Sequence, residues 1–158
     1  MKMPPRPAEL DRLDSWVGNW NSNFEMCSGG KTMTMTGTGV ISWDCEKRIL
    51  FERATSDMGE MGKVCELILY SWDCDAGRYK VGYFSGMGEA NMGHMKWNEK
   101  KGAFELRGKG KNPMTHQTTI FEMDIRMPDQ NTMTFKATEW DALHLTKLSE
   151  GTGTAKRA

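Results

Sequence analysis

The chain has 158 residues, with 21 basic and 21 acidic side chains that give a formal net charge of zero at pH 7. A chain of this length is expected to form one domain, over residues 1–158, with a sizeable hydrophobic core. The balanced charge argues against nucleic acid or an anionic membrane as a partner, and no apolar run reaches the roughly 20 residues of a membrane-spanning helix.

The N-terminal stretch is proline-rich and lacks the apolar segment of a signal peptide. We therefore expect a cytoplasmic protein, with residues 1–6 disordered. The first expected element is a helix from Pro7 to Val17, because proline suits a first helical turn and Leu10, Leu13 and Val17 recur at helical spacing.

From Asn19 onward, apolar and polar residues alternate with a period of two, which is typical of half-buried strands. The first strand follows the helix directly, and Gly29 and Gly30 separate it from a second strand over 31–43. Further strands are predicted at residues 48–56, 63–72, 78–85, 91–97, 103–110, 117–127, 132–140 and 143–157.

The connections between these strands are short and rich in Gly, Asn, Asp and Pro. About ten strands with one apolar side each must protect two sheet edges, and closure into a barrel removes both. The prediction is therefore an all-β fold, an up-and-down antiparallel β-barrel of about ten strands with a short N-terminal helix. A β-sandwich is the alternative, although it usually has longer crossover loops.

The cysteine and methionine contents bear on the function. Four cysteines with no CxxC spacing do not form a zinc-site pattern, and reduced thiols are favoured over two disulfides. Methionine occurs 14 times, and this flexible apolar side chain often lines adaptable binding surfaces.

Three stretches resemble a known family. They are Trp16-Val17-Gly18-Asn19-Trp20, the glycine- and aromatic-rich segment from Tyr70 to Gly88, and the segment from Lys109 to Thr115 with Phe121-Glu122-Met123 after it. Together they resemble the DUF1579 family of calycin, or lipocalin-like, barrels. The resemblance implies a barrel with a lumen, and it carries over no catalytic residue.

Haem proteins of the nitrobindin type are similar in architecture, and His144 invites comparison with their proximal histidine. The sequence departs from them after Trp20, where Asn21, Ser22 and Asn23 stand in place of repeated glycines. A second metal hypothesis is Cu(I) held by Met92, His94 and Met95, although strict alternation puts Met95 on the opposite face. We expect no cofactor, and no nucleotide-binding or hydrolase motif occurs.

The sequence therefore predicts binding of a small, largely apolar molecule in the barrel lumen, without nucleic acid or membrane partners. The expected lining residues are Met33, Met35, Arg53, Cys65, Tyr83, Met123, Met133 and Glu139. A small enzyme (isomerase, cyclase or hydrolase) that uses isolated polar groups in the lumen is the alternative. A barrel that is packed solid is a third interpretation, and the sequence also allows a homodimer.

Arg53 and Glu52 are adjacent in one strand, so their side chains point to opposite faces. The more apolar neighbours lie on the face of Arg53, which predicts that Arg53 points inward, toward Glu139 or an anionic ligand group. If Glu52 pointed inward instead, burial would raise its pKa and make it the best general acid–base candidate.

Overall fold

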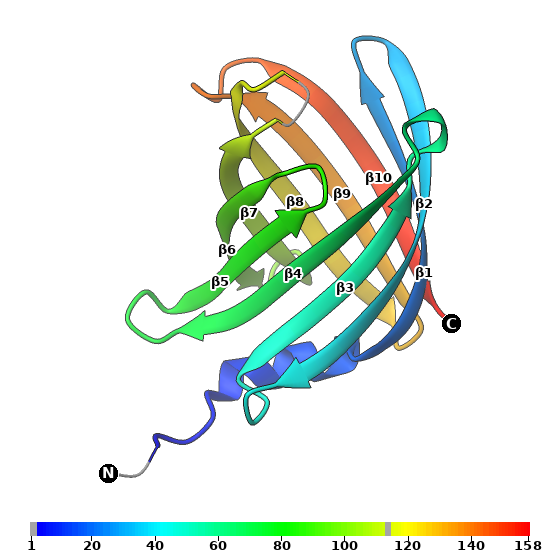
Figure 1. Cartoon of the computed structure of the whole chain (residues 1–158). Coiled ribbons are helices and arrows are strands. Elements are labelled where there is room, and N and C mark those ends of the chain that lie inside the picture. The colour runs from blue at the N-terminus through cyan, green and yellow to red at the C-terminus, as the bar shows by residue number, and fades with distance from the viewer. Residues whose placement is uncertain (1–2, 113–114) are drawn as a thin grey trace.

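The computed structural model describes residues 3–112 and 115–158. Over these residues a short 3₁₀ helix is followed by ten antiparallel strands, with one further 3₁₀ turn (Figure 1). The elements are η1 (Ala8–Trp16), β1 (Gly18–Ser28), β2 (Lys31–Asp44), β3 (Ile49–Asp57), η2 (Gly59–Met61), β4 (Lys63–Asp73), β5 (Arg78–Ser85), β6 (Ala90–Asn98), β7 (Ala103–Lys111), β8 (Thr118–Asp129), β9 (Thr132–Asp141) and β10 (Lys147–Arg157).

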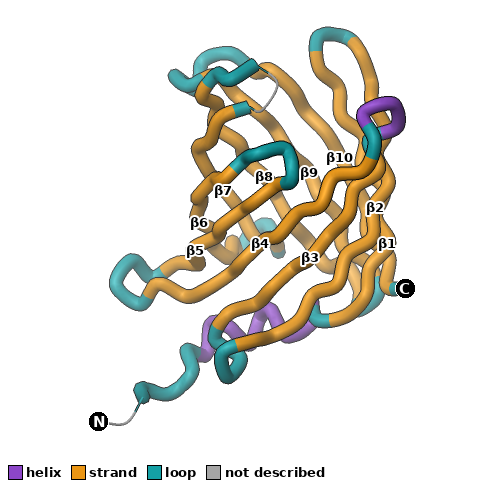
Figure 2. Tube along the Cα trace, viewed as in Figure 1, coloured by secondary structure: helices purple, strands orange, loops and turns teal. Residues whose placement is uncertain are grey.

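The strands close into a barrel in which each pairs with its neighbours in sequence and β1 pairs with β10 (Figure 2). The closing ladder runs from Trp20 opposite Arg157 to Ser28 opposite Ser149. No strand edge is left along this ladder, so the structure confirms the all-β barrel prediction. Among the described residues no helix is long and apolar enough to cross a membrane.

One end of the barrel, called the base here, is covered by η1 (Figure 1). Leu10, Leu13 and Trp16 are all buried in the core, at a spacing of three residues that matches a 3₁₀ helix. The predicted helical face was wrong at its end, because Val17 is 37% exposed and Trp16 takes the buried place. The indole of Trp20 donates to the Trp16 carbonyl at 2.8 Å, which ties the helix to β1.

The core lies at this base. Trp16 packs edge-on against Tyr70 and Phe104, with ring centroids 5.4 and 5.2 Å apart. Residues from all ten strands complete the cluster, namely Trp20, Ile41, Leu50, Tyr70, Tyr79, Val81, Met95, Phe104, Leu106, Ile125, Met133 and Ala155. The helix and this cluster together close the base of the barrel.

One strand boundary differs from the sequence-based expectation, whereas the disorder expected for residues 1–6 stays a prediction. Residues 1 and 2 lie outside the described residues, and Arg6 pairs with Asp14 at 3.0 Å and donates to the Lys47 carbonyl at 2.7 Å. The last strand was expected from residue 143 but begins at Lys147. Asp141 accepts a hydrogen bond from the Leu145 amide at 2.8 Å, which holds the intervening residues in a turn.

Candidate functional site

The interior between the core cluster and the open end of the barrel, called the mouth here, is the candidate site. Most of the side chains that point inward in this part keep accessible surface, Thr119 and Ser149 being buried, whereas most of the inward side chains at the base belong to the buried core cluster. We call this space the upper lumen. Its lining includes Phe24, Met33, Met35, Glu52, Glu66, Tyr83, Phe121, Met123, Phe135 and Glu139.

Glycines on neighbouring strands leave room for two of the aromatic rings. A Cβ atom built on Gly108 of β7 would lie 2.2 Å from the ring of Phe121, so the ring occupies the space that a side chain there would need. Gly151 and Gly153 of β10 stand in the same relation to Phe24, at 2.7 and 2.5 Å. Both rings therefore lie along the barrel wall, over these glycines.

Glu52 points inward from β3 into the deepest part of the upper lumen. Its Oε2 atom accepts a hydrogen bond of 2.9 Å from the hydroxyl of Tyr70 on β4. Desolvation in the barrel interior raises the pKa of Glu52 to about 7, against the opposing effect of Tyr70, and the nearby Glu66 carboxylate adds to the rise. Burial, together with the Glu52 carboxylate, raises the pKa of Tyr70.

A second tyrosine–glutamate pair lies one strand further along. The hydroxyl of Tyr83 on β5 donates to Glu66 Oε1 at 2.6 Å, and Ser56 donates to Glu66 Oε2 at 2.7 Å. Burial and the adjacent Glu66 raise the pKa of Tyr83, so this phenol stays protonated at neutral pH. Glu66 therefore has a donor on each carboxylate oxygen, whereas one oxygen of Glu52 is not hydrogen-bonded to any described residue.

Two further carboxylates lie toward the mouth. Glu139 of β9 accepts hydrogen bonds from Ser149 at 3.2 Å and from the Asn112 side-chain amide at 3.3 Å. The pKa of Glu89 is raised by desolvation, and the carboxylates of Glu66 and Glu139 raise it further. The four glutamates thus act on one another electrostatically across one interior space.

The raised pKa of Glu52 predicts a pH-dependent stability. Between about pH 4.5 and 7 the folded state keeps a proton that the unfolded chain has lost, so the free energy of unfolding should fall as pH rises through this range. Replacing Glu52 with Gln removes this dependence. Between pH 5 and pH 8 the free energy of unfolding of the variant, measured in urea, should rise relative to that of wild type by about 2.5 kcal/mol. An equal stability difference at the two pH values would show that Glu52 titrates normally.

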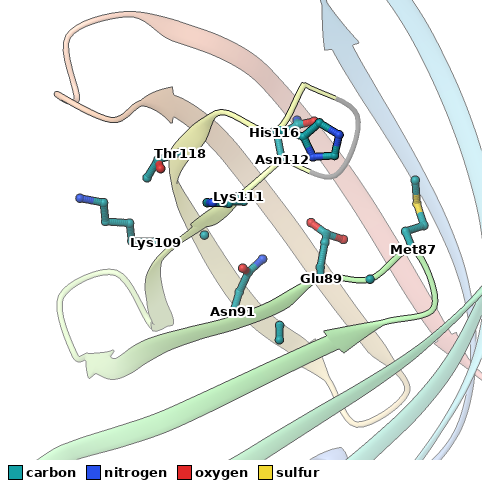
Figure 3. A pocket seen from close by; sticks show the side chains of 11 residues that line it. Met87, Glu89, Asn91, Lys109, Lys111, Asn112, His116 and Thr118 are labelled. Carbon is teal, nitrogen blue, oxygen red and sulfur yellow. The ribbon is translucent and has the colours of Figure 1, made fainter.

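A pocket of about 560 Å³ opens where β6 and β7 separate near the mouth (Figure 3). Their ladder ends at Met92 opposite Lys109, beyond which Asn91 and Gly110 are not paired with each other. The amide of Asn91 lies 2.2 Å from where a Gly110 Cβ would be, so it fills the space over this glycine. Asn112 lines the pocket and also bonds Glu139, which places the opening beside the upper lumen.

Two predicted lining residues point the other way. Arg53 is exposed on the outer wall, and Cys65 is exposed as well, so both predictions were wrong. Both errors have the same cause. Directly opposed residues of a ladder share a face, and Arg53 opposes Leu67 while Thr55 opposes Cys65. Arg53 and Cys65 therefore lie on one face of the β3–β4 pair, and that face is the outer one. Glu139, the predicted partner of Arg53, is bonded to Asn112 and Ser149 instead.

The other predicted residues have inward orientations at different heights. Met33, Met35 and Met123 face the upper lumen with Tyr83 and Glu139, whereas Met133 is 3% exposed and belongs to the core at the base. Glu66, Phe24, Phe121 and Phe135 also line the upper lumen, although the sequence did not predict them there. Their strands alternate clearly, but only the strand register shows which of them meet.

The residues of the two metal hypotheses do not converge on the lumen. The ring of His144 packs edge-on against Trp140, with 4.7 Å between the ring centroids, and its Nε2 lies 3.3 Å from Glu122, on the outer face of β8. Met92 is 60% exposed, whereas Met95 is fully buried. Within residues 3–112 and 115–158, no group of three or more His, Cys, Asp or Glu side chains is placed to hold a metal ion.

Comparison with known proteins was made at three levels. The profile of the family described as "Protein of unknown function (DUF1579)" matches residues 7–142. The chain belongs to the DUF1579 family. This membership confirms the resemblance noted from the sequence. Among curated proteins, no match was found.

Two solved structures resemble this DUF1579 protein along nearly the whole chain. The S-type phycobiliprotein lyase CPES from Guillardia theta has a TM-score of 0.66 at 14% identity, covering 97% of this chain and 94% of that one. Rv2717c from M. tuberculosis has a TM-score of 0.72 at 13% identity, covering 98% and 99%. At such identities the likeness shows the fold alone.

Proposed function

We propose that this DUF1579 protein binds a small, largely apolar molecule that carries a polar group, in the upper lumen. The observation that supports this most strongly is the accessible surface on most of the inward side chains above the buried core cluster at the base. A barrel that is packed solid would bury its inward side chains along the whole length. Methionine and phenylalanine side chains would contact the apolar part of the ligand, while carboxylates and phenols would meet its polar group.

Met35 provides the test. Its side chain faces the upper lumen from β2, whereas the adjacent Thr34 is exposed on the outside. The neutral fluorescent probe N-phenyl-1-naphthylamine should bind wild type saturably, and Met35→Asp should weaken this binding by about tenfold or more, because a charge enters an apolar wall. Thr34→Asp is the matched control and should leave the affinity within about twofold. If wild type binds no probe saturably, the proposal is wrong.

Catalysis by proton transfer is the second candidate function, and Glu52 is the observation that favours it. A carboxyl group with a pKa near 7 can both donate and accept a proton at neutral pH. Tyr70 fixes its orientation from the side, and the second oxygen faces the lumen. The pH dependence predicted above for Glu52 is the property that such a role requires.

Cytoplasmic location and a homodimer stay predictions. The outer wall carries partly exposed apolar side chains, among them Phe84 and Met92, which are 41% and 60% exposed. Light scattering of the purified protein would establish its oligomeric state.

A further inference from the structure

The charge that faces the upper lumen has one sign. Glu52, Glu66, Glu89 and Glu139 point inward and keep part of their surface accessible. On β3 to β9, strand alternation turns every described lysine and arginine side chain outward. These are Arg53, Lys63, Arg78, Lys80, Lys96, Arg107, Lys109, Lys111, Arg126 and Lys136.

The remaining strands do not change this balance. Lys31 lies at the exposed tip of the β1–β2 hairpin, and Lys147 pairs with Glu150 at 2.8 Å. Arg157 is held at the base, where its guanidinium lies 4.5 Å over the ring of Trp20 and donates to the Ser15 carbonyl. The charges that act on Glu52 and Glu89 are accordingly those of other carboxylates.

Hydrogen bonding leaves one acceptor unused at the deep end of this space. Both oxygens of Glu66 and both oxygens of Glu139 accept protein donors, but Glu52 accepts only the Tyr70 hydroxyl, through Oε2. Oε1 of Glu52 has no hydrogen-bond partner among the described residues, and it lies 3.9 Å from where a Cβ on Gly39 would be. A desolvated carboxylate oxygen of this kind favours a donor, and a charged donor most of all.

The walls around the carboxylates suit an organic group better than a metal ion. The carboxylates are spread over β3, β4, β9 and the residue before β6, and no three metal-ligating side chains of the described residues come together. The rings of Phe24, Tyr83, Phe121 and Phe135 are each only partly buried. The face of an aromatic ring attracts an organic cation, and it also packs against the apolar part of a ligand.

We propose that the upper lumen selects an organic ammonium ion, with its apolar part against the phenylalanines and methionines and its charged nitrogen directed to Glu52 and Glu66. This inference rests on the proposed lumen-binding function and specifies its ligand class.

Binding of such a cation must draw a proton from Glu52. The titratable groups that face Glu52 are Tyr70 and Glu66 on β4 and Tyr83 on β5, while the adjacent part of β2 presents Gly37 and Gly39. None of these is a cation, so Glu52 is about half protonated at pH 7. An ammonium ion beside it stabilises the carboxylate form. About half a proton should therefore leave per ligand bound at pH 7, and only about a tenth at pH 8, where Glu52 is already mostly ionised and the amine is still a cation.

Three probes with one ring system test the charge preference. 2-Naphthylmethylamine is a cation, 2-naphthylmethanol is neutral and 2-naphthoate is an anion at pH 8, and each is titrated into the full-length protein by calorimetry. The amine should bind about tenfold tighter than the alcohol, and the acid more weakly than either. Calorimetry of the amine at pH 7 in two buffers of different ionisation enthalpy measures the released proton.

Two variants connect the preference to this site. Glu52→Gln should weaken the amine about five- to tenfold and leave the alcohol unchanged, because only the charge is removed. Glu25→Gln, on the exposed outer face of β1, is the matched control and should change neither. Glu66→Gln provides a second inward variant if Glu52→Gln is poorly folded.

The outcomes separate the two proposals. Equal binding of the amine and the alcohol would overturn the cation preference and leave lumen binding in place. Tighter binding of the acid would overturn the preference as well. If none of the three probes binds, the proposed function fails and this inference fails with it.

Discussion

Replacing Trp16 with alanine is expected to lower the free energy of unfolding by about 3–5 kcal/mol, the range found when a buried tryptophan is truncated. Trp16 is 2% exposed and lies at the centre of the base, edge-on to Tyr70 and Phe104. Its removal leaves a cavity between the helix and strands β4 and β7, and the closed barrel cannot collapse to fill it. Urea unfolding followed by circular dichroism measures the loss.

The neighbouring Val17 provides the control for this variant. Val17 is 37% exposed and follows the helix directly, so Val17→Ala should change stability by no more than about 0.5 kcal/mol. If Trp16→Ala were as mild as Val17→Ala, the helix would not be an integral part of the core. The base of the barrel would then be open as well as the mouth.

Gly108→Val is expected to close the upper lumen without unfolding the barrel. The new side chain would meet the Phe121 ring, 2.2 Å from the position of its Cβ, and would push the ring off the wall into the lumen. We expect a stability loss of about 1–3 kcal/mol from the overpacking. The affinity for N-phenyl-1-naphthylamine should fall by more than about tenfold, since the ring takes space that the probe needs.

Two further variants show whether the ring is the cause. Combining Gly108→Val with Phe121→Ala removes the displaced ring and should restore probe affinity to within about threefold of wild type. Arg107→Val, at the adjacent outward position, adds the same side chain outside the barrel and should leave affinity unchanged. Continued tight binding by Gly108→Val alone would show that the probe binds elsewhere.

Much of the architecture could be predicted from local patterns. The alternation of Phe121, Met123 and Ile125 with charged neighbours identified β8 and its inward face correctly. The Gly29-Gly30 hairpin fell where it was expected, and both glycines have positive φ angles that suit a tight turn. The closed barrel followed from the number of strands and their short connections.

The inward face of β3 could not be predicted in the same way. An apolar set usually marks the buried face, but Phe51, Leu67 and Leu69 lie on the outer wall of this barrel and stay only partly exposed. The upper lumen in turn contains carboxylates. They are tolerated inside the barrel because they keep some accessible surface and accept hydrogen bonds from tyrosine hydroxyls. Since inside and outside are both mixed in polarity here, the pattern of the strand alone favoured the wrong side.

The tyrosine–glutamate pairs depend on strand register, which the sequence did not specify. Tyr70 lies opposite Leu50 and therefore reaches Glu52 diagonally across the β3–β4 ladder. A shift of one residue in that ladder would turn Glu52 to the outer wall. From the sequence, Glu52 was only the alternative to Arg53 as the inward charged residue of this strand. The register of the paired strands shows that Glu52 is the inward one.

The central claim, an accessible upper lumen that binds small molecules, is tested most directly by methionine-methyl NMR of the wild-type protein titrated with N-phenyl-1-naphthylamine. The methyl signals of Met35 and Met123 should shift saturably, because both side chains face the upper lumen. The signals of Met61 and Met92, which are 43% and 60% exposed outside it, should stay in place. Shifts confined to Met61 or Met92, with none at Met35 and Met123, would contradict the account.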